Sequence, residues 1–184
     1  MVYIMLGKGF EETEAVAPGD VLRRAQIPMQ YVGIGGKIVE GAHGISLVAD
    51  ITEEEMNLSD MDMIVLPGGL GGVASIEGSE KAMAAVEYAL KNDRYVAAIC
   101  AAPMILGKRG YLDGRHAVCY PGCEEGMGNA IVHPEREAVV DGKIITGRAP
   151  GAAIEFGLTL AGMLPGVYTP DEIASYMVYR RENP

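Results

Sequence analysis

One cysteine stands where a strand pattern changes into a helix pattern. The run Tyr95–Ile99 is short and rich in Val, Ile and Ala, which is typical of a parallel strand buried on both faces. Cys100 follows it directly, and Pro103 is a residue type favoured in the first turn of a helix. With no Gly or Asn between strand and helix, the chain must turn sharply at Cys100. This arrangement is typical of a nucleophile elbow, with Cys in place of Ser and Ala in place of Gly.

A cysteine in such a turn has two interpretations. The thiolate is the nucleophilic form, and a helix N-terminus behind the sulfur favours it, so we expect Cys100 to ionise readily. The alternative is that Cys100 is a small buried apolar residue, which is the commoner role of a free cysteine. This stretch alone favours neither interpretation.

A carboxyl group is available near the first strand. Val2–Leu6 predicts a strand, and Glu11, Glu12 and Glu14 open a helix after the following loop. Glu14 is placed to share a crevice with Cys100, where repulsion from a thiolate would keep it protonated, able to donate a hydrogen bond to sulfur or to carry protons. The alternative is that the three glutamates only complement the helix dipole.

Backbone donors are expected beside the same crevice. Gly68 and Gly69 follow a third buried strand, and the N–H groups of Gly69 and Ala101 could form an oxyanion hole. The alternative is a loop that uses Gly only for its positive φ. The sequence has neither the six-residue dinucleotide spacing nor a P-loop match, so we predict no nucleotide cofactor.

Strand and helix patterns alternate along the whole chain, which predicts a single α/β domain over residues 1–184 with a mostly parallel sheet. The predicted strands are 2–6, 27–34, 61–66, 95–99, 117–120, 131–133, 138–140 and 144–146. Residues 37–50 predict a small hairpin or side strands, and 51–60 a connector. The predicted helices are 11–25, 79–91, 103–108, 152–164 and 169–180. Loops 7–14, 67–72 and 147–151 and the Cys100 turn all leave carboxyl strand ends, where ligands bind in such sheets. This convergence favours a functional site at Cys100.

Composition limits the partners and the compartment. The formal net charge is -10, so a basic surface for nucleic acid is not expected. No apolar run approaches the length of a membrane span or a signal sequence, which predicts a cytoplasmic protein. The three cysteines form no disulfide framework, and this fits a reducing compartment.

The sequence predicts no metal centre. His43, His116 and His133 have no triad spacing and are expected to be surface or satisfied residues. Cys119 and Cys123 have no second pair that would complete a zinc site, although they could resolve an oxidised Cys100 as a disulfide.

Four motifs in a fixed order resemble the ThiJ/PfpI superfamily, specifically its DJ-one branch. They are Gly-Phe-Glu-Glu-Thr-Glu-Ala at 9–15, Leu-Pro-Gly-Gly at 66–69, Ala-Ala-Ile-Cys-Ala-Ala-Pro at 97–103 and Thr-Gly-Arg-Ala-Pro-Gly at 146–151. The resemblance implies a flavodoxin-like three-layer α/β/α sandwich, related to class I glutamine amidotransferase domains. It also implies a homodimer without a cofactor.

The resemblance assigns roles to individual residues. Cys100 matches the reactive cysteine, Glu14 its protonated carboxyl partner, and Gly69 and Ala101 the oxyanion donors, with Gly68, Tyr120, Arg148 and Pro150 around the pocket. Tyr120 is a departure, because several members have His at this place. Its absence removes the usual Cys–His base pair and leaves Glu14 as the main proton carrier.

The resemblance implies a glutathione-independent glyoxalase or a deglycase that acts on methylglyoxal-like dicarbonyls or their glycation adducts. The substrate would thus be a small carbonyl compound. An alternative is a redox sensor or redox-regulated chaperone of oxidative stress, working without turnover. Further alternatives are a cysteine hydrolase and a role in thiazole-monophosphate (thiamin) biosynthesis. Both main hypotheses require the Glu14 carboxyl to lie close to the Cys100 sulfur.

Overall fold

A seven-stranded sheet forms the centre of the computed structural model, which describes residues 1–181. Its strand order is β10-β11-β7-β6-β1-β2-β5, and all neighbours are parallel except β10 and β11. The strands are β1 (Val2–Leu6), β2 (Met29–Gly33), β5 (Ile51–Thr52), β6 (Met63–Leu66), β7 (Tyr95–Ile99), β10 (Ala138–Asp141) and β11 (Ile144–Gly147). The mostly parallel sheet predicted from the sequence is confirmed.

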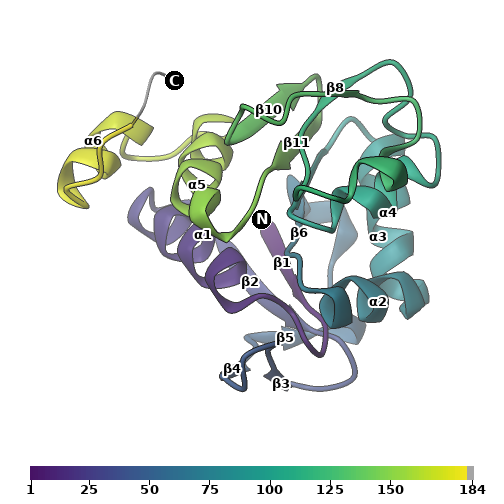
Figure 1. Cartoon of the computed structure of the whole chain (residues 1–184). Helices are drawn as coiled ribbons and strands as arrows, with labels where there is room; N and C mark the ends of the chain where they lie inside the picture. Colours follow the sequence, from purple (N-terminus) through teal and green to yellow (C-terminus); the bar gives the residue numbers. More distant parts are fainter. Residues whose placement is uncertain (182–184) are drawn as a thin grey trace.

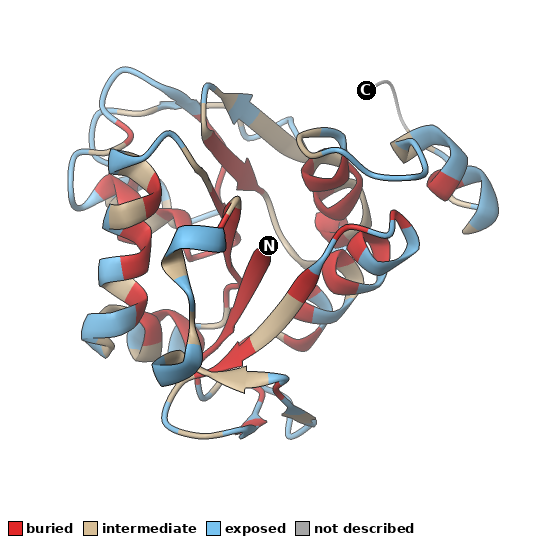
Figure 2. Cartoon of the chain, turned by 180° about the vertical axis from the view of Figure 1, so that it is seen from behind, coloured by how far each residue is buried: buried red, intermediate tan, exposed pale blue. Residues whose placement is uncertain are grey.

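Helices cover both faces of this sheet. Helices α1 (Glu12–Arg24) and α5 (Ala153–Gly162) pack together on one face, while α2 (Leu70–Gly78), α3 (Glu80–Lys91) and α4 (Pro103–Gly107) lie on the other (Figure 1). Seen from behind, the central strands are buried along most of their length (Figure 2). The three-layer α/β/α sandwich is therefore confirmed.

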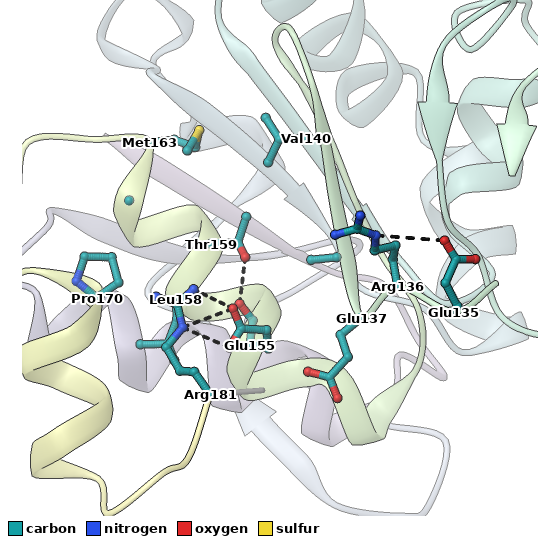
Figure 3. A pocket seen from close by; sticks show the side chains of 12 residues that line it. Glu135, Arg136, Glu137, Val140, Glu155, Leu158, Thr159, Met163, Pro170 and Arg181 are labelled. Atoms are coloured by element: carbon teal, nitrogen blue, oxygen red, sulfur yellow. Dashed lines mark hydrogen bonds and ion pairs between the residues drawn. The ribbon is translucent and has the colours of Figure 1, made fainter. Parts of the chain in front are cut away.

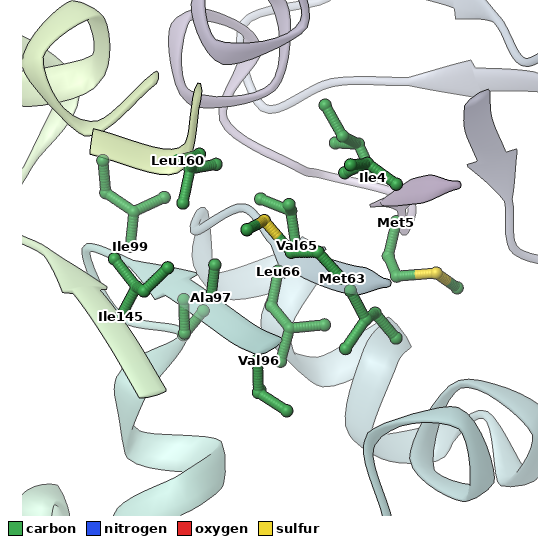
Figure 4. Close-up of a cluster of buried hydrophobic side chains, with 14 of the residues drawn as sticks. Ile4, Met5, Met63, Val65, Leu66, Val96, Ala97, Ile99, Ile145 and Leu160 are labelled. Atoms are coloured by element: carbon green, nitrogen blue, oxygen red, sulfur yellow. The ribbon is translucent and has the colours of Figure 1, made fainter. Parts of the chain in front are cut away.

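The core lies between the sheet and the helices on each face. Ile4, Val65, Ile99 and Leu160 are among its fully buried members (Figure 4). Side chains of β1, β6 and β7 are buried throughout most of these strands, as expected for parallel strands with both faces covered. This packing holds the strand ends in fixed positions relative to one another.

Register brings several strand ends to one edge of the sheet. Leu66 of β6 pairs with Ala98 of β7, and Gly147 of β11 pairs with Ile99. Strand β1 runs parallel to β6, beginning with the pairing of Val2 with Met63. The carboxyl ends of β1, β6, β7 and β11 therefore meet, and the predicted convergence of their loops is confirmed.

The sequence-based prediction missed helix α2. The glycines after Leu66 were interpreted as a loop, because Gly is a poor helix former. The structure explains their presence: a Cβ atom on Gly72 would lie 2.7 Å from the Cα atom of Phe10. Small residues in this helix thus allow its backbone to approach the loop between β1 and α1.

Shorter elements also differ from the prediction. The connector at 51–60 contains the edge strand β5 and two 3-10 turns, and the predicted strand 117–120 is reduced to His116–Ala117. The last helix, α6, ends at Tyr176 instead of about residue 180, and Val178 beyond it has a left-handed φ of 55°. The remaining short elements are β3 (Ile38–Glu40), β4 (Ser46–Val48), β8 (His116–Ala117), β9 (Ile131–Val132), η1 (Glu53–Glu55), η2 (Leu58–Asp60), η3 (Glu124–Met127) and η4 (Pro150–Ala152).

Two contacts fix the C-terminal segment. The predicted capping box at the start of α6 is present, with Thr169 and Glu172 bonded to each other. Arg181 donates from Nε and Nη2 to the carboxylate of Glu155 in α5, at distances of 2.6 to 3.2 Å (Figure 3). Its Nη1 atom donates to Asp171 at 2.8 Å. These ion pairs tie the end of the described chain to the face of the sandwich formed by α1 and α5. No helix within residues 1–181 is both long and apolar enough to cross a membrane.

Candidate active site

Cys100 forms the turn directly after β7. Its φ of 66° lies in the left-handed region, which is unfavourable for a residue with a side chain. The turn is fixed on both sides: the Cys100 N–H donates to the Gly147 carbonyl at 2.9 Å, and the Cys100 carbonyl accepts from the Tyr120 N–H at 2.9 Å. The predicted sharp elbow is confirmed, and it leaves Cys100 only 8% exposed.

Glu14 lies in the first turn of α1 and is fully buried. Its Oε2 atom accepts the Gly68 N–H at 2.8 Å, while its Oε1 atom has no hydrogen-bond partner within the described part of the chain. An ionised carboxylate with one buried and unpartnered oxygen is costly, so this environment favours the protonated carboxyl.

Gly68 brings the carboxyl and the sulfur together. A Cβ atom at this position would lie 2.5 Å from Glu14 Oε2 and 3.0 Å from Cys100 Sγ. No larger residue fits between them, and the missing side chain allows both groups to occupy one small space. The two groups are close enough for each to perturb the ionisation of the other. The structure thus brings the two predicted catalytic side chains together.

The two groups perturb each other's ionisation. Burial raises the pKa of Glu14 to about 7, although hydrogen bonds from Cys100 and Gly68 oppose the change. Burial, followed by the charge and hydrogen bond of Glu14, raises the pKa of Cys100 to about 12. The pair therefore loses one proton near neutrality and its second only at strongly alkaline pH. Between these values it is a monoanion with one shared proton.

The expectation that a helix N-terminus makes Cys100 ionise readily was wrong. Helix α4 behind the sulfur has only five residues, and burial and the Glu14 carboxylate outweigh its influence. Two backbone amides act in the opposite direction: the N–H groups of Ala101 and Gly69 bond to Cys100 and lower the pKa of its thiol. These are the amides predicted as oxyanion donors, and both act on the Cys100 sulfur.

A cavity of about 480 Å³ opens at Cys100. It is lined by Glu11, Ala42, His43, Gly69, Leu70, Cys100, Ala101, Tyr120, Pro121, Gly122, Cys123 and Pro150. Tyr120 and Pro150 thus lie where the sequence predicted them. Arg148 lines a neighbouring cavity of about 310 Å³ that shares Tyr120 and Pro121, while Gly68 and Glu14 lie behind Cys100.

The three glutamates at the start of α1, with Glu11 as its N-cap, have different environments. Glu11 caps the helix by accepting the Glu14 N–H at 2.8 Å. Glu12 pairs with His43, whose Nδ1 atom lies 2.8 Å from Glu12 Oε2. Only Glu14 reaches Cys100, so the helix-dipole interpretation is adequate for Glu11 alone.

Sequence reasoning missed His43 as a wall of the cavity, because this residue belongs to the hairpin between β3 and β4. The turn signal of Gly41 and Gly44 was visible, but no spacing rule connects it to Cys100. Glu11, Glu12 and His43 have side-chain atoms within 4.8 Å of one another. The closeness of these three side chains is explained by two contacts: Glu11 caps helix α1, and Glu12 forms an ion pair with His43.

The remaining histidines and cysteines lie in two other groups. His116 Nδ1 contacts His133 Nε2 at 2.7 Å, so these two residues satisfy each other as predicted. All three cysteines are free thiols. Cys119 is buried, which raises its pKa to about 12, and Cys123 faces the cavity.

Comparison with known proteins agrees with this geometry. The model of the DJ-1/PfpI family matches residues 1–163. Protein dj-1beta of Drosophila melanogaster is 34% identical over 173 residues, which cover 93% of this chain and 92% of the relative. Deglycase PfpI of Pyrococcus furiosus is 34% identical over 143 residues, covering 77% and 86%. Protein DJ-1 homolog B of Arabidopsis thaliana is 35% identical over 97% of this chain, which spans only 41% of that longer relative.

Solved structures with a similar fold also come from DJ-1 proteins. The crystal structure of Drosophila melanogaster DJ-1beta matches with a TM-score of 0.91 and 32% identity, covering 98% of each chain. The structure of oxidised Toxoplasma gondii DJ-1 matches with a TM-score of 0.88 and 30% identity, again over 98% of each chain. The resemblance inferred from the four motifs is confirmed.

The shared proton predicts a pH-dependent thiol. We expect the alkylation rate of Cys100 by iodoacetamide to rise through pH 7, because Glu14 and Cys100 become a monoanion there and part of that population carries the charge on sulfur. Peptide-resolved mass spectrometry between pH 5 and pH 9 would follow this rate. Glu14→Gln should abolish the step near pH 7, whereas Glu12→Gln should retain it. A step that persists in Glu14→Gln would assign the ionisation to another group.

Proposed function

Because the chain belongs to the DJ-1/PfpI family, we propose that it is a cysteine-dependent enzyme of the glyoxalase or deglycase type. Its substrates would be methylglyoxal-like dicarbonyls or their glycation adducts. The observation that carries the proposal is the buried pair of Glu14 and Cys100 beside a cavity of about 480 Å³. Relatives named deglycases support the same reaction class.

The first step would be addition of the thiol to an aldehyde. In the reactive monoanion, the Cys100 sulfur carries the charge and Glu14 carries the proton. The sulfur attacks the aldehyde carbon, the C=O electron pair moves to oxygen, and Glu14 gives its proton to that oxygen. The product is a hemithioacetal, and Glu14 is left as a carboxylate base.

The second step would be isomerisation. Glu14 removes the hydrogen of the former aldehyde carbon while the neighbouring carbonyl oxygen gains a proton, so an enediol forms between the two carbons. Glu14 then returns its proton to the neighbouring carbon while the hydroxyl on the first carbon gives up its proton, which produces a thioester of the hydroxy acid. The proton gained by one oxygen and the proton lost by the other cancel over the two steps. Water attacks the thioester, Glu14 accepts a proton from it, and the Cys100 thiolate leaves. The pair returns to its starting form, and the net change is addition of one water.

The amides of Gly69 and Ala101 would support these steps. Both amides favour negative charge on the Cys100 sulfur. Once sulfur is bonded to carbon, the same donors are close to the oxygen on that carbon. A buried, preorganised donor pair is worth more in this position than in water, so the developing oxyanion would be stabilised.

Methylglyoxal turnover tests this proposal. We expect purified protein to form lactate from methylglyoxal, Cys100→Ala to abolish the activity, and Glu14→Gln to lower kcat by about 100-fold or more, the usual contribution of a general acid–base group. Cys119→Ala, which removes a buried thiol outside the cavity, is the matched control. Absence of lactate with the wild-type protein, or full activity in Cys100→Ala, would refute the proposal.

Peroxide sensing is a second candidate function, favoured by the unpartnered Oε1 atom of Glu14. A protonated carboxyl could donate a short, charge-assisted hydrogen bond to an oxygen added to the Cys100 sulfur, with the Gly69 and Ala101 amides as further donors. The matching structure of oxidised Toxoplasma gondii DJ-1 supports this candidate.

Intact-mass measurement after mild peroxide treatment would test the sensor. We expect a selective gain of two oxygen atoms on Cys100, and loss of this selectivity in Glu14→Gln. Cys123→Ser should retain it, because Cys123 has no buried carboxyl beside it. Oxidation distributed over the 11 methionines would count against a sensor role.

A second copy of the chain is the proposed partner. Ile38 and Val48 pair across the hairpin of β3 and β4 and are 75% and 72% exposed. Val48 also shares a hollow of about 270 Å³ with Val16 of α1. An apolar surface of this kind is costly in water and is typical of a protein interface.

Solution mass tests the dimer. We expect light scattering to give twice the mass of the 19.5 kDa chain, and Val48→Glu to give the monomer because it introduces a charge into the apolar patch. Val140→Glu, at a half-exposed valine of β10, should leave the mass unchanged. A monomeric wild-type protein at micromolar concentration would contradict the proposal.

A further inference from the structure

His43 lines the same cavity as Cys100 and comes from a loop that is firmly attached to the site. Two backbone bonds fasten its hairpin to the connection between β1 and α1. The Ala42 N–H donates to the Phe10 carbonyl at 2.8 Å, and the Gly9 N–H donates to the Glu40 carbonyl at 2.8 Å. The position of the imidazole is therefore coupled to the helix that carries Glu14.

Glu12 orients the imidazole ring. One of its oxygens accepts the His43 backbone N–H at 2.7 Å, and the other lies 2.8 Å from His43 Nδ1. Glu12 is only 6% exposed and accepts a further N–H from Ile45, so its carboxylate is itself held in place. Since an ionised carboxylate only accepts, Nδ1 carries the hydrogen, and Nε2 has no bond to any described residue.

The charges around His43 favour its protonated form. The hydrogen bond and the charge of Glu12 raise the pKa of His43; burial opposes this change, and Glu11 adds a smaller upward contribution. Burial tends to raise the pKa of Glu12, but the hydrogen bonds from His43 and Ile45 outweigh it and the net pKa is lowered. Within the described chain, Glu11 and Glu12 are the charged groups that face this imidazole.

The proposed isomerisation needs a second proton carrier. Glu14 can move the hydrogen between the two carbon atoms, but both substrate oxygens also change protonation. When the first carbon loses its hydrogen, the carbonyl oxygen on the second carbon must gain a proton. When the thioester forms, the hydroxyl on the first carbon must lose one. Glu14 is occupied with the carbon-bound proton during both events, so another group must exchange protons with the two oxygens.

We propose that His43 is this second acid–base group, which exchanges protons with the substrate oxygens while Glu14 moves the proton between carbons. The inference rests on the proposed function. Imidazolium Nε2–H donates to the carbonyl oxygen as the enediol forms, and neutral Nε2 takes the proton of the other oxygen as the thioester forms. Each cycle leaves His43 protonated, so no external acid or base is consumed.

Tyr120 is the rival donor. It lines the same cavity, is 46% exposed, and carries a hydroxyl that could protonate a carbonyl oxygen. Its backbone is bonded to Cys100, whereas His43 alone has a buried carboxylate that fixes its ring. That orientation is what a proton transfer at a defined atom requires, so the geometry favours His43.

Four variants test the inference: His43→Gln, Glu12→Gln, Tyr120→Phe and the control His116→Gln, which alters a histidine outside the cavity. Lactate formation from methylglyoxal gives kcat and KM as functions of pH, and iodoacetamide alkylation of Cys100 reports the thiol separately. We expect His43→Gln to lower kcat by about 100-fold, with KM changed less than threefold and alkylation unchanged. The alkaline fall of kcat should disappear in His43→Gln and move to lower pH in Glu12→Gln.

The outcomes separate this inference from the function on which it rests. Wild-type protein that forms no lactate overturns both. Wild-type turnover with kcat of His43→Gln within twofold overturns the role of His43 and leaves the proposed function intact. A large loss in Tyr120→Phe with none in His43→Gln would assign the second proton to the tyrosine hydroxyl. Equal losses in His43→Gln and in the His116→Gln control would also overturn the inference.

Discussion

The shared proton of Glu14 and Cys100 is the constraint on which the site depends. Glu14 is fully buried, and one of its carboxyl oxygens has no hydrogen-bond partner within the described chain. Raising the pKa of this carboxyl from 4.5 to about 7 corresponds to about 3 kcal/mol against its ionised form. As a result, the thiol and the carboxyl together carry a single negative charge near neutral pH. A thiol and a carboxyl that would each be ordinary in water thereby become one reactive unit.

The rest of the molecule holds these two groups in contact. Glu14 is placed by the first turn of α1, which Glu11 caps, while Cys100 is placed by a strained turn bonded to Gly147 and Tyr120. Gly68 provides the space between them. The distance between the Glu14 carboxyl and the Cys100 sulfur therefore depends on three strands, β1, β6 and β7. The parallel register of the sheet determines where those strands end. Buried strands that cannot shift register are well suited to this purpose.

Much of this arrangement could be predicted from the sequence, because it depends on local patterns. The apolar runs, the Gly loops at their carboxyl ends and the Cys100 turn identified the sheet and the crevice, and four motifs identified the family. The pKa of Cys100 could not be predicted, since it depends on burial and on a carboxylate that approaches from a distant segment. His43 was missed for a similar reason: its partner Glu12 lies 31 residues away in the chain. Helix α2 was missed because its glycines, which are poor helix formers, are present for close packing against the neighbouring loop.

The distance along the chain between Glu14 and Cys100 has a consequence for a newly made molecule. Glu14 belongs to the first helix, and Cys100 becomes its neighbour only after β6 and β7 have joined the sheet beside β1. A nascent or unfolded chain therefore carries three cysteines with the acidity of free thiols and a glutamate that is fully ionised. The perturbed pair exists only in the completed sandwich, so folding itself couples the thiol to the carboxyl. Any event that opens the sheet between β1 and β6 would separate the two groups and return each to its ordinary acidity.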